Sequence, residues 1–297
     1  LGVGAMVAGA RSGSASMGNA GGALFQAPQS YLMHSLLAYQ RAQEEYADRA
    51  GVRFLTMSGQ SAKGMYDTFK RFADESMFEA CTADPDAQNH PMPAERMAEL
   101  ANLVHTQYWD KKDPPELQFR HDMMRAKLYG FMDRPLEVLR RYPPTDTSMP
   151  ARYARAISTY RFGDLRDALA QIDSLVRSTP NNPYFYELYG QALLEAGHAA
   201  AAIPPLERAV KLAPDPALIQ IELAQAMVAS NSGKMVDTAI PLLHAALIKE
   251  PESADAYTQL AMAYGRKNDL ADADLASAQA AFARGDNKTA RELAARA

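Results

Sequence analysis

The segment RAQEEYADRAG, residues 41–51, carries two carboxylates at a spacing that suits metal chemistry. Glu44 and Asp48 are four residues apart, so in a helix they lie on the same face. A glutamate at such a position can ligate a metal ion while the aspartate orients a neighbouring ligand. The same spacing is also typical of a solvated helix face, with Arg41 and Arg49 as neighbours. Both interpretations stay open at this point.

Other chemical motifs are absent from the 297 residues. The six histidines include no HExxH pair, and no Walker loop, GxGxxG or GxSxG motif occurs, which leaves nucleotide binding and serine hydrolase chemistry unsupported. The lone cysteine, Cys81, excludes an intramolecular disulfide and any multi-cysteine metal site.

Apolar residues at helical spacing predict helices throughout the first half of the chain. No alternating strand pattern of useful length appears, so the sequence predicts an all-α protein. The first 30 residues are rich in Gly, Ala, Ser and Met, and we expect residues 1–30 to form a mobile segment. We also expect the chain to be the C-terminal part of a longer protein, the alternative being an ordinary flexible terminus. The helices are expected at residues 31–55, 61–76, 94–106, 113–130 and 134–142.

The second half of the chain contains a repeat. Ala168, Ala202, Ala239 and Ala273 are separated by 34, 37 and 34 residues, and a proline follows the first three alanines at a distance of twelve residues. This is the tetratricopeptide pattern, a helix–turn–helix unit of about 34 residues. The predicted units are 149–182, 183–216, 217–253 and 254–287, followed by capping helices to residue 297. The three extra residues of the third unit are expected in its inter-helix turn, at residues 230–234, because a longer loop costs little entropy.

Composition limits the class of protein. Hydrophobic residues make up 47% and charged residues 22%, which excludes wholesale disorder. The formal net charge of −4 argues against a nucleic-acid partner, which usually calls for a basic excess. No apolar run approaches the length of about 18 residues that indicates a membrane span.

The order of these motifs resembles peptidase family M48, the HtpX- and BepA-like zinc metalloproteases. The Glu44–Asp48 pair, followed by Arg49 and Gly51, resembles the ExxxD motif of that family, and NHPMPAER at residues 89–96 resembles its downstream His-Pro element. The tetratricopeptide array resembles the C-terminal part of the BepA-like branch. The resemblance implies that residues 31–148 are the helical remainder of a metalloprotease domain and residues 149–297 a repeat domain.

The resemblance also implies site residues and a cofactor. Glu44 would ligate Zn²⁺, and Asp48 would orient a ligand without touching the ion. His90 and Arg96 would lie near the site. Because a catalytic zinc needs three protein ligands and a general base, and the HExxH helix is missing here, we expect this chain to be inactive alone and not to hold zinc stably. The implied setting is protein quality control at the periplasm or periphery of the cell envelope, with protein or peptide substrates and outer-membrane assembly machinery as partners.

The first helices of the repeats are predicted to line a partner-binding groove. Some of these side chains would instead pack between neighbouring units, an alternative that the sequence leaves open. The alternative for the whole chain is a non-catalytic tetratricopeptide scaffold. The groove positions are Tyr153, Ile157, Tyr160, Arg161, Tyr184, Glu187, Gln191, Leu194, Leu218, Ile221, Gln225 and Val228.

Overall fold

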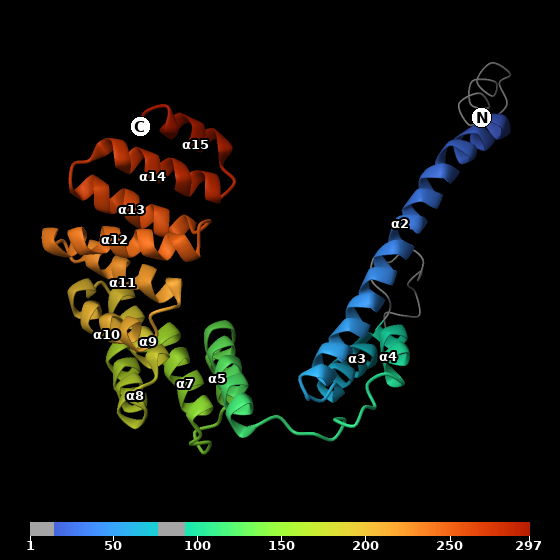
Figure 1. The fold of residues 1–297 in the computed structure, drawn as a ribbon, viewed down its shortest axis with the longest axis horizontal. Coiled ribbons are helices and arrows are strands. Elements are labelled where there is room, and N and C mark those ends of the chain that lie inside the picture. The colour runs from blue at the N-terminus through green and yellow to red at the C-terminus, as the bar shows by residue number, and fades with distance from the viewer. Residues whose placement is uncertain (1–14, 77–92) are drawn as a thin grey trace. The chain divides into compact units, whose positions relative to one another are not determined.

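The computed structural model of the chain describes residues 15–76 and 93–297, and their side chains over residues 35–75 and 95–297. These residues form α-helices joined by short turns, and no strand occurs among them, which confirms the predicted all-α class (Figure 1). The chain divides into two compact units, Leu1–Gln118 and Phe119–Ala297, which we call the first unit and the repeat unit. The predicted boundary at residues 148/149 therefore falls inside the repeat unit. No helix in the described parts is long and apolar enough to cross a membrane.

The first unit is built around one long helix. Helix α2 spans Ala15–Met57, and α3 (Lys63–Ser76) and α4 (Pro93–Ala101) follow it. Residues 15–30 of the predicted mobile segment lie in helix α2, while residues 1–14 lie outside the described part. The physical reason is that helix propagation is cooperative, so a long helical stretch extends through residues of moderate propensity once it is nucleated.

A small apolar core holds α2, α3 and α4 together. Val52 of α2, Leu100 of α4 and Val104 are buried with Ala62, and Phe69 of α3 packs against them. The chain leaves α2 through Gly59, whose φ of 71° lies in the left-handed region that glycine tolerates. This core fixes α4 against the C-terminal third of α2, which is where the Glu44–Asp48 pair lies.

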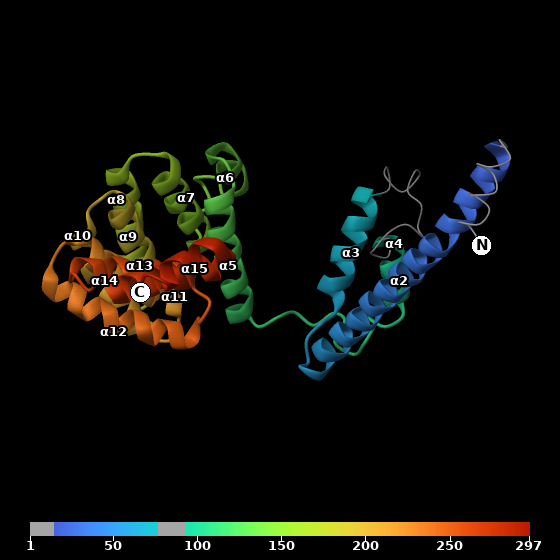
Figure 2. The ribbon, with the colours of Figure 1, turned by 90° about the horizontal axis from the view of Figure 1, so that it is seen from above.

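The repeat unit is a series of antiparallel helix pairs (Figures 1 and 2). The second helix of each pair packs against the first helix of the next, as in a solenoid. Side-chain caps such as Asp164 and Asn182, which accept from backbone N–H groups, define several of the helix starts. The helices are α5 (Pro115–Met132), α6 (Pro135–Arg141), α7 (Met149–Phe162), α8 (Leu165–Ser178), α9 (Pro183–Glu195), α10 (Ala199–Leu212), α11 (Ala217–Ala229), α12 (Gly233–Lys249), α13 (Ala254–Arg266), α14 (Leu270–Ala283) and α15 (Asn287–Ala294).

Two glycines let helices of the repeat unit approach closely. A β-carbon at Gly190 of α9 would collide with the side chain of Leu206 in α10. A β-carbon at Gly130 of α5 would lie 2.8 Å from the β-carbon of Ile157 in α7. The second contact, with buried Ala126 and Val138, places α5 and α6 in the same core as α7 and α9. This packing explains why the repeat unit begins near α5 rather than at residue 149.

The insertion in the third predicted repeat lies in a helix and not in a turn. Helix α12 has 17 residues, whereas its counterpart α10 has 14. The turn before α12, residues 230–232, matches in length the turn 196–198 before α10. Three residues are close to one helical turn, so α12 lengthens without changing which face it buries. The prediction that the turn absorbs the insertion is therefore wrong.

Candidate functional site

Helices α2 and α4 bring the predicted carboxylates and Arg96 together. Glu44 and Asp48 lie one turn apart on the face of α2 that meets α4, and Arg96 reaches them from the first turns of α4. The Arg96 guanidinium donates from Nε to Asp48 Oδ2 at 2.8 Å and from Nη2 to Asp48 Oδ1 at 2.6 Å. Its Nη1 lies 3.2 Å from Glu44 Oε2. One arginine therefore contacts both carboxylates. It binds Asp48 through two parallel hydrogen bonds, a bidentate pair that we call the fork.

The environment of Arg96 strengthens this arrangement. The Asp48 side chain is only 9% exposed and that of Arg96 19%. The Phe69 ring of α3 lies 4.2 Å from Arg96 Cζ, so the cation packs over an aromatic face. The hydrogen bond to Asp48 raises the pKa of Arg96 above its ordinary value, with the charges of Asp48 and Glu44 adding to it and burial opposing it.

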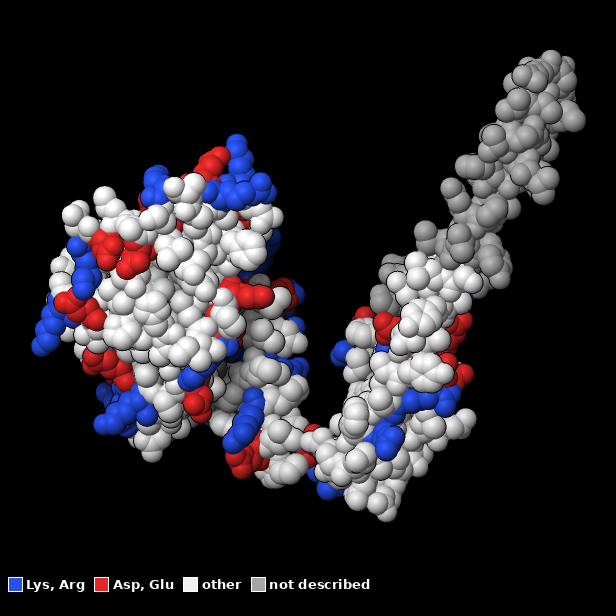
Figure 3. Space-filling view, turned by 45° about the horizontal axis from the view of Figure 1, so that its top comes forward, with Lys and Arg blue, Asp and Glu red and all other residues white. Residues whose placement is uncertain are grey.

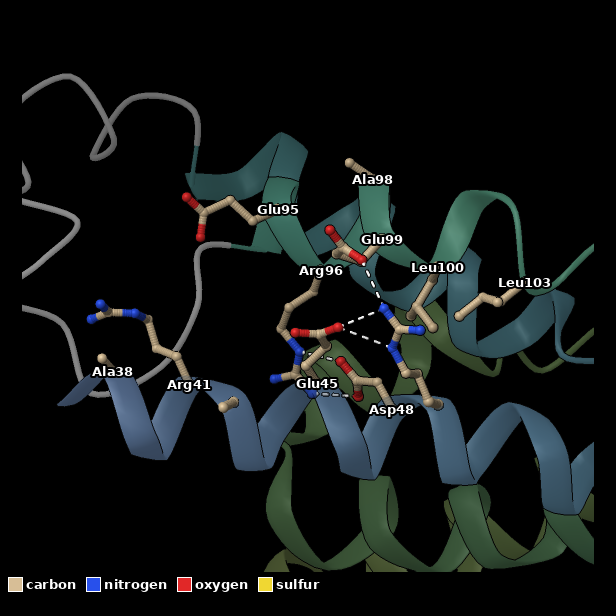
Figure 4. A pocket seen from close by; sticks show the side chains of 12 residues that line it. Ala38, Arg41, Glu45, Asp48, Glu95, Arg96, Ala98, Glu99, Leu100 and Leu103 are labelled. Atoms are coloured by element: carbon tan, nitrogen blue, oxygen red, sulfur yellow. Dashed lines mark hydrogen bonds and ion pairs between the residues drawn. The ribbon is translucent and has the colours of Figure 1, made fainter. Parts of the chain in front are cut away.

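A second ion pair borders the first. Arg49 pairs with Glu45 on α2 at 2.6 Å and with Glu99 on α4 at 3.4 Å, and these side chains are about half exposed. Both pairs line a cavity of about 570 Å³ between α2 and α4, in which the charged groups of the two helices point toward one another (Figure 4). The sequence analysis did not identify Glu99, which belongs to no spacing pattern. Phe69 lies at helical spacing from Met65 and Phe72, which indicates a packing face but not a contact with Arg96.

The carboxylates of this site are already engaged by arginine. Both carboxylate oxygens of Asp48 are engaged by Arg96, which leaves this residue in a supporting position. Glu44 contacts Arg96 through Oε2, and its side chain is 31% exposed. In the parts of the chain that the structure describes, no three His, Cys, Asp or Glu side chains gather in a way that could hold a metal ion. Glu44 offers a single carboxylate here, whereas a catalytic zinc requires three protein ligands.

His90 lies outside the described residues, so its predicted place near the site stays a prediction.

The structure corrects the predicted partner groove at four positions. Tyr153, Ile157, Ile221 and Val228 are buried, because they face the neighbouring helices rather than open space. Tyr153 is the one of these that also borders a cavity. The remaining positions, which are partly or fully exposed, are Tyr160, Arg161, Tyr184, Glu187, Gln191, Leu194, Leu218 and Gln225.

An ion pair crosses the repeat unit from α5 to α9. Lys127 Nζ of α5 lies 2.9 Å from both Oε1 and Oε2 of Glu187 on α9, while α7 lies between these helices in the chain. Glu222 of α11 is close enough to feel the charges of Glu187, Lys127 and Glu195. Sequence reasoning missed Lys127 and Glu222, since α5 was not recognised as part of the array and the alternation of buried and exposed positions on α11 is weak.

Comparison with known proteins finds a matching family model in each unit. The sequence model of peptidase family M48 matches residues 1–104, and that of the tetratricopeptide repeat matches residues 153–217 and 223–276. A curated relative, the beta-barrel assembly-enhancing protease of Yersinia pestis, is 25% identical over 252 residues, which is 82% of this chain and 50% of the relative. The chain thus spans about half the length of that protein.

Solved structures resemble the chain more loosely. YrrB, described as a tetratricopeptide protein with an unusual peptide-binding site, is 18% identical with a TM-score of 0.47 over 58% of this chain and 89% of its own. The MamA protein described as MSR-1 C2 is 15% identical with a TM-score of 0.46 over 58% of this chain and 98% of its own.

Proposed function

We propose that the chain joins part of a peptidase family M48 domain to a tetratricopeptide array and works as the C-terminal portion of a zinc metalloendopeptidase in envelope protein quality control. The relative named for enhancing β-barrel assembly supports a place in the periplasm or at the periphery of the envelope, close to outer-membrane assembly machinery. The repeats would dock protein substrates or partners. The HExxH pair and its general base are not among these 297 residues and would come from elsewhere in the protein.

The fork between Arg96 and Asp48, with Glu44 beside it, is the observation that carries this proposal. Asp48 and Arg96 form a rigid, mostly buried pair that locks α4 onto α2. Glu44 lies one turn along the same face and is held in place by Nη1 of the same guanidinium. Such a pair would orient the Glu44 carboxylate before the metal arrives, which is the usual task of groups behind a metal ligand.

The chemistry of the site divides between the metal and these side chains. A bound Zn²⁺ would polarise the scissile carbonyl and lower the pKa of a water molecule. Glu44 would supply one carboxylate oxygen to hold the ion. Asp48 and Arg96 would keep that carboxylate at a fixed position and prevent α2 and α4 from separating.

Substitution of Glu44 in the full-length protein tests the proposal. Glu44→Gln should abolish proteolysis and lower the zinc content measured by mass spectrometry, because a neutral amide is a poor zinc ligand. Asp48→Ala should weaken activity or metal affinity by roughly 10–100-fold. Glu45→Gln is the matched control, since Glu45 is the next residue on α2 and pairs with Arg49 at the exposed side. Full zinc content and full proteolysis in Glu44→Gln would contradict the role proposed for Glu44, whereas a full-length wild-type protein that neither binds zinc nor cleaves protein would favour the non-catalytic scaffold.

The choice of a protein partner over a nucleic acid rests on charge. Acidic residues exceed basic ones, 35 against 31. The face of the repeat unit turned to the viewer in Figure 3 is uncharged across its middle, with Lys, Arg, Asp and Glu side chains toward its edge. A phosphate backbone would call for a continuous basic surface, whereas peptide grooves are apolar with a few polar groups.

A further inference from the structure

A cavity of about 830 Å³ opens at the start of the repeat unit, and we call it the α5–α9 cavity. Its described lining comes from α5, from Tyr153 of α7, and from the turn that leads into α9 together with the first residues of that helix. All of these residues lie in the repeat unit, so the cavity is described without reference to the first unit.

The charges that line the α5–α9 cavity are positive. Arg120 and Lys127 of α5 border it, and no carboxylate occurs among its described lining residues. Lys127 Nζ lies 2.9 Å from both carboxylate oxygens of Glu187, which does not itself line the cavity. An ammonium group has three N–H donors and a guanidinium five, so each cation has donors for a further acceptor beside an existing partner. The lining therefore favours an anionic group over a cationic one.

Two further features of the cavity favour an anion. Asn182, Pro183 and Tyr184 place the amino-terminal end of the 13-residue helix α9, with its partial positive charge, at the cavity. The Tyr153 side chain is 2% exposed, and its hydroxyl has no hydrogen-bond partner among the described residues, an arrangement that costs free energy. Burial, together with the nearby charge of Glu187, raises the pKa of Tyr153 well above its ordinary value. The hydroxyl therefore stays protonated and is able to donate to a carboxylate.

Apolar side chains lie next to these donors. Phe119, Met124 and Tyr184 border the cavity and are each about half exposed. The Tyr184 ring centre lies 5.7 Å from Lys127 Nζ, so an apolar surface adjoins a cation. A ligand that matches both would carry a carboxylate and a large apolar group close together.

We propose that the α5–α9 cavity binds an extended segment of a partner protein in which a Glu or Asp side chain stands next to a large apolar side chain. The carboxylate would lie between Arg120 and Lys127 and accept from the Tyr153 hydroxyl, and the apolar neighbour would pack against Phe119 and Tyr184. A side chain suits the site better than a chain end. Its carboxylate reaches the buried hydroxyl on a thin methylene stem, whereas a chain end brings its backbone and last side chain with it.

This inference rests on the docking role proposed above and specifies its partner. It does not depend on peptidase activity. Binding is measured on the 297-residue chain and proteolysis on the full-length protein, so the failure of one proposal can be told apart from the failure of the other.

Three peptides with a neutral fluorophore at the amino end test the specificity. The first is Gly-Ser-Phe-Glu-Leu-Ser-Gly-amide, the second has Gln in place of Glu, and the third is Gly-Ser-Phe-Gln-Leu with a free carboxyl end. The Glu peptide should bind at least about tenfold more tightly than the other two, the size of one charge-assisted hydrogen bond, and added salt should narrow this gap. Equal affinity of the Glu and Gln peptides, no binding of any peptide, or tightest binding of the free carboxyl end would overturn the proposal.

Charge variants locate the binding to this cavity. Arg120→Gln should remove most of the preference for Glu over Gln, whereas Arg166→Gln, whose side chain on α8 is 91% exposed, should keep it. Glu187→Gln should bind the Glu peptide at least as tightly as the wild type does, because it releases Lys127. Glu207→Gln, on an exposed part of α10, should leave the affinity unchanged. A preference that survives Arg120→Gln, or that is lost in Glu187→Gln, would overturn the proposal.

Two more variants test the floor and the apolar side of the cavity. Tyr153→Phe should weaken the Glu peptide by a factor of roughly three to ten, as expected for one hydrogen bond, while the melting temperature holds or rises. Phe119→Ser should weaken the Glu and Gln peptides by the same factor. Leu136→Ser is its control, because Leu136 lies on α6 away from the cavity and is 73% exposed. Full affinity in both Tyr153→Phe and Phe119→Ser would show that the peptide binds elsewhere and would overturn the proposal.

Discussion

At the scale of single residues, the grip of Arg96 on Asp48 is the most consequential contact of the first unit. Removing the guanidinium leaves a buried carboxylate without its partner, which typically costs about 3 kcal/mol or more. Arg96→Ala should therefore lower the stability of the first unit by that amount, measured by denaturant unfolding of the full chain. Arg49→Ala is the control, because Arg49 and Glu45 are about half exposed and such pairs contribute at most about 1 kcal/mol. Equal losses in both variants would contradict the importance of the fork.

The Glu222 carboxyl makes the stability of the repeat unit depend on pH. Burial raises its pKa from the ordinary 4.5 to about 8, so between these values the folded state holds a proton that the unfolded state has lost. Stability due to this group is therefore greatest at low pH and falls as pH rises toward 8, by up to about 1.4 kcal/mol per pH unit. The groups that face it are Glu187, Glu195, Lys127 and Tyr160.

Glu222→Gln tests this dependence, because the amide cannot ionise. Melting temperatures of the wild-type chain should fall between about pH 5 and pH 9, and the fall should be smaller in Glu222→Gln. Glu207→Gln should keep the wild-type slope. A variant whose melting curve shifts with pH as much as the wild type would show that Glu222 is already ionised at neutral pH.

At the scale of elements, close packing between α9 and α10 depends on the lack of a side chain at Gly190. Gly190→Ala would drive a methyl group into Leu206, so it should destabilise the repeat unit by about 1–3 kcal/mol. Gly265→Ala, in α13, meets no atom within 4 Å and should be neutral or stabilising by up to about 1 kcal/mol. Thermal denaturation of both variants measures the difference. A reversed order would mean that α10 shifts away at little cost.

The elements also show what the sequence could and could not predict. The period of the alanines and prolines predicted the helix pairs from α7 to α14, because each unit places small residues and prolines at the same points of its helix packing. The period could not show whether an inserted turn of helix lies in a loop or extends α12, since both keep the register. The glycines of residues 15–30 suggested a loop, but cooperativity with the rest of α2 outweighed their low propensity.

The candidate site was predictable only in part. Helical spacing placed Glu44 and Asp48 on one face, and that arrangement holds in α2. The partnership of Asp48 with Arg96 links residues 48 positions apart, which no local pattern encodes. The groove positions failed where a residue such as Ile157 faces a neighbouring helix, because a repeat register gives the inward side of a helix but not the depth of each side chain.

At the scale of the whole molecule, zinc chemistry requires more than this chain. The 297 residues purified alone should bind zinc with less than stoichiometric occupancy after dialysis and should not cleave casein, because one carboxylate cannot hold the ion and no HExxH base is present. Atomic absorption and a gel-based cleavage assay measure both outcomes. Retained stoichiometric zinc with chelator-sensitive cleavage would show that these residues form a complete site of another kind.

The last helix of the repeat unit buries few side chains. Helix α15 has eight residues and buries only Ala290, and Arg296, which follows the helix, pairs with Asp274 of α14. In a solenoid each layer gains stability from its neighbours, so a layer that buries few side chains opens first. Backbone amides of α15 should exchange with deuterium fastest, those of α13 more slowly, and those of α9 and α11 slowest. Local unfolding of the array would then begin at α15, while its middle helices stay folded.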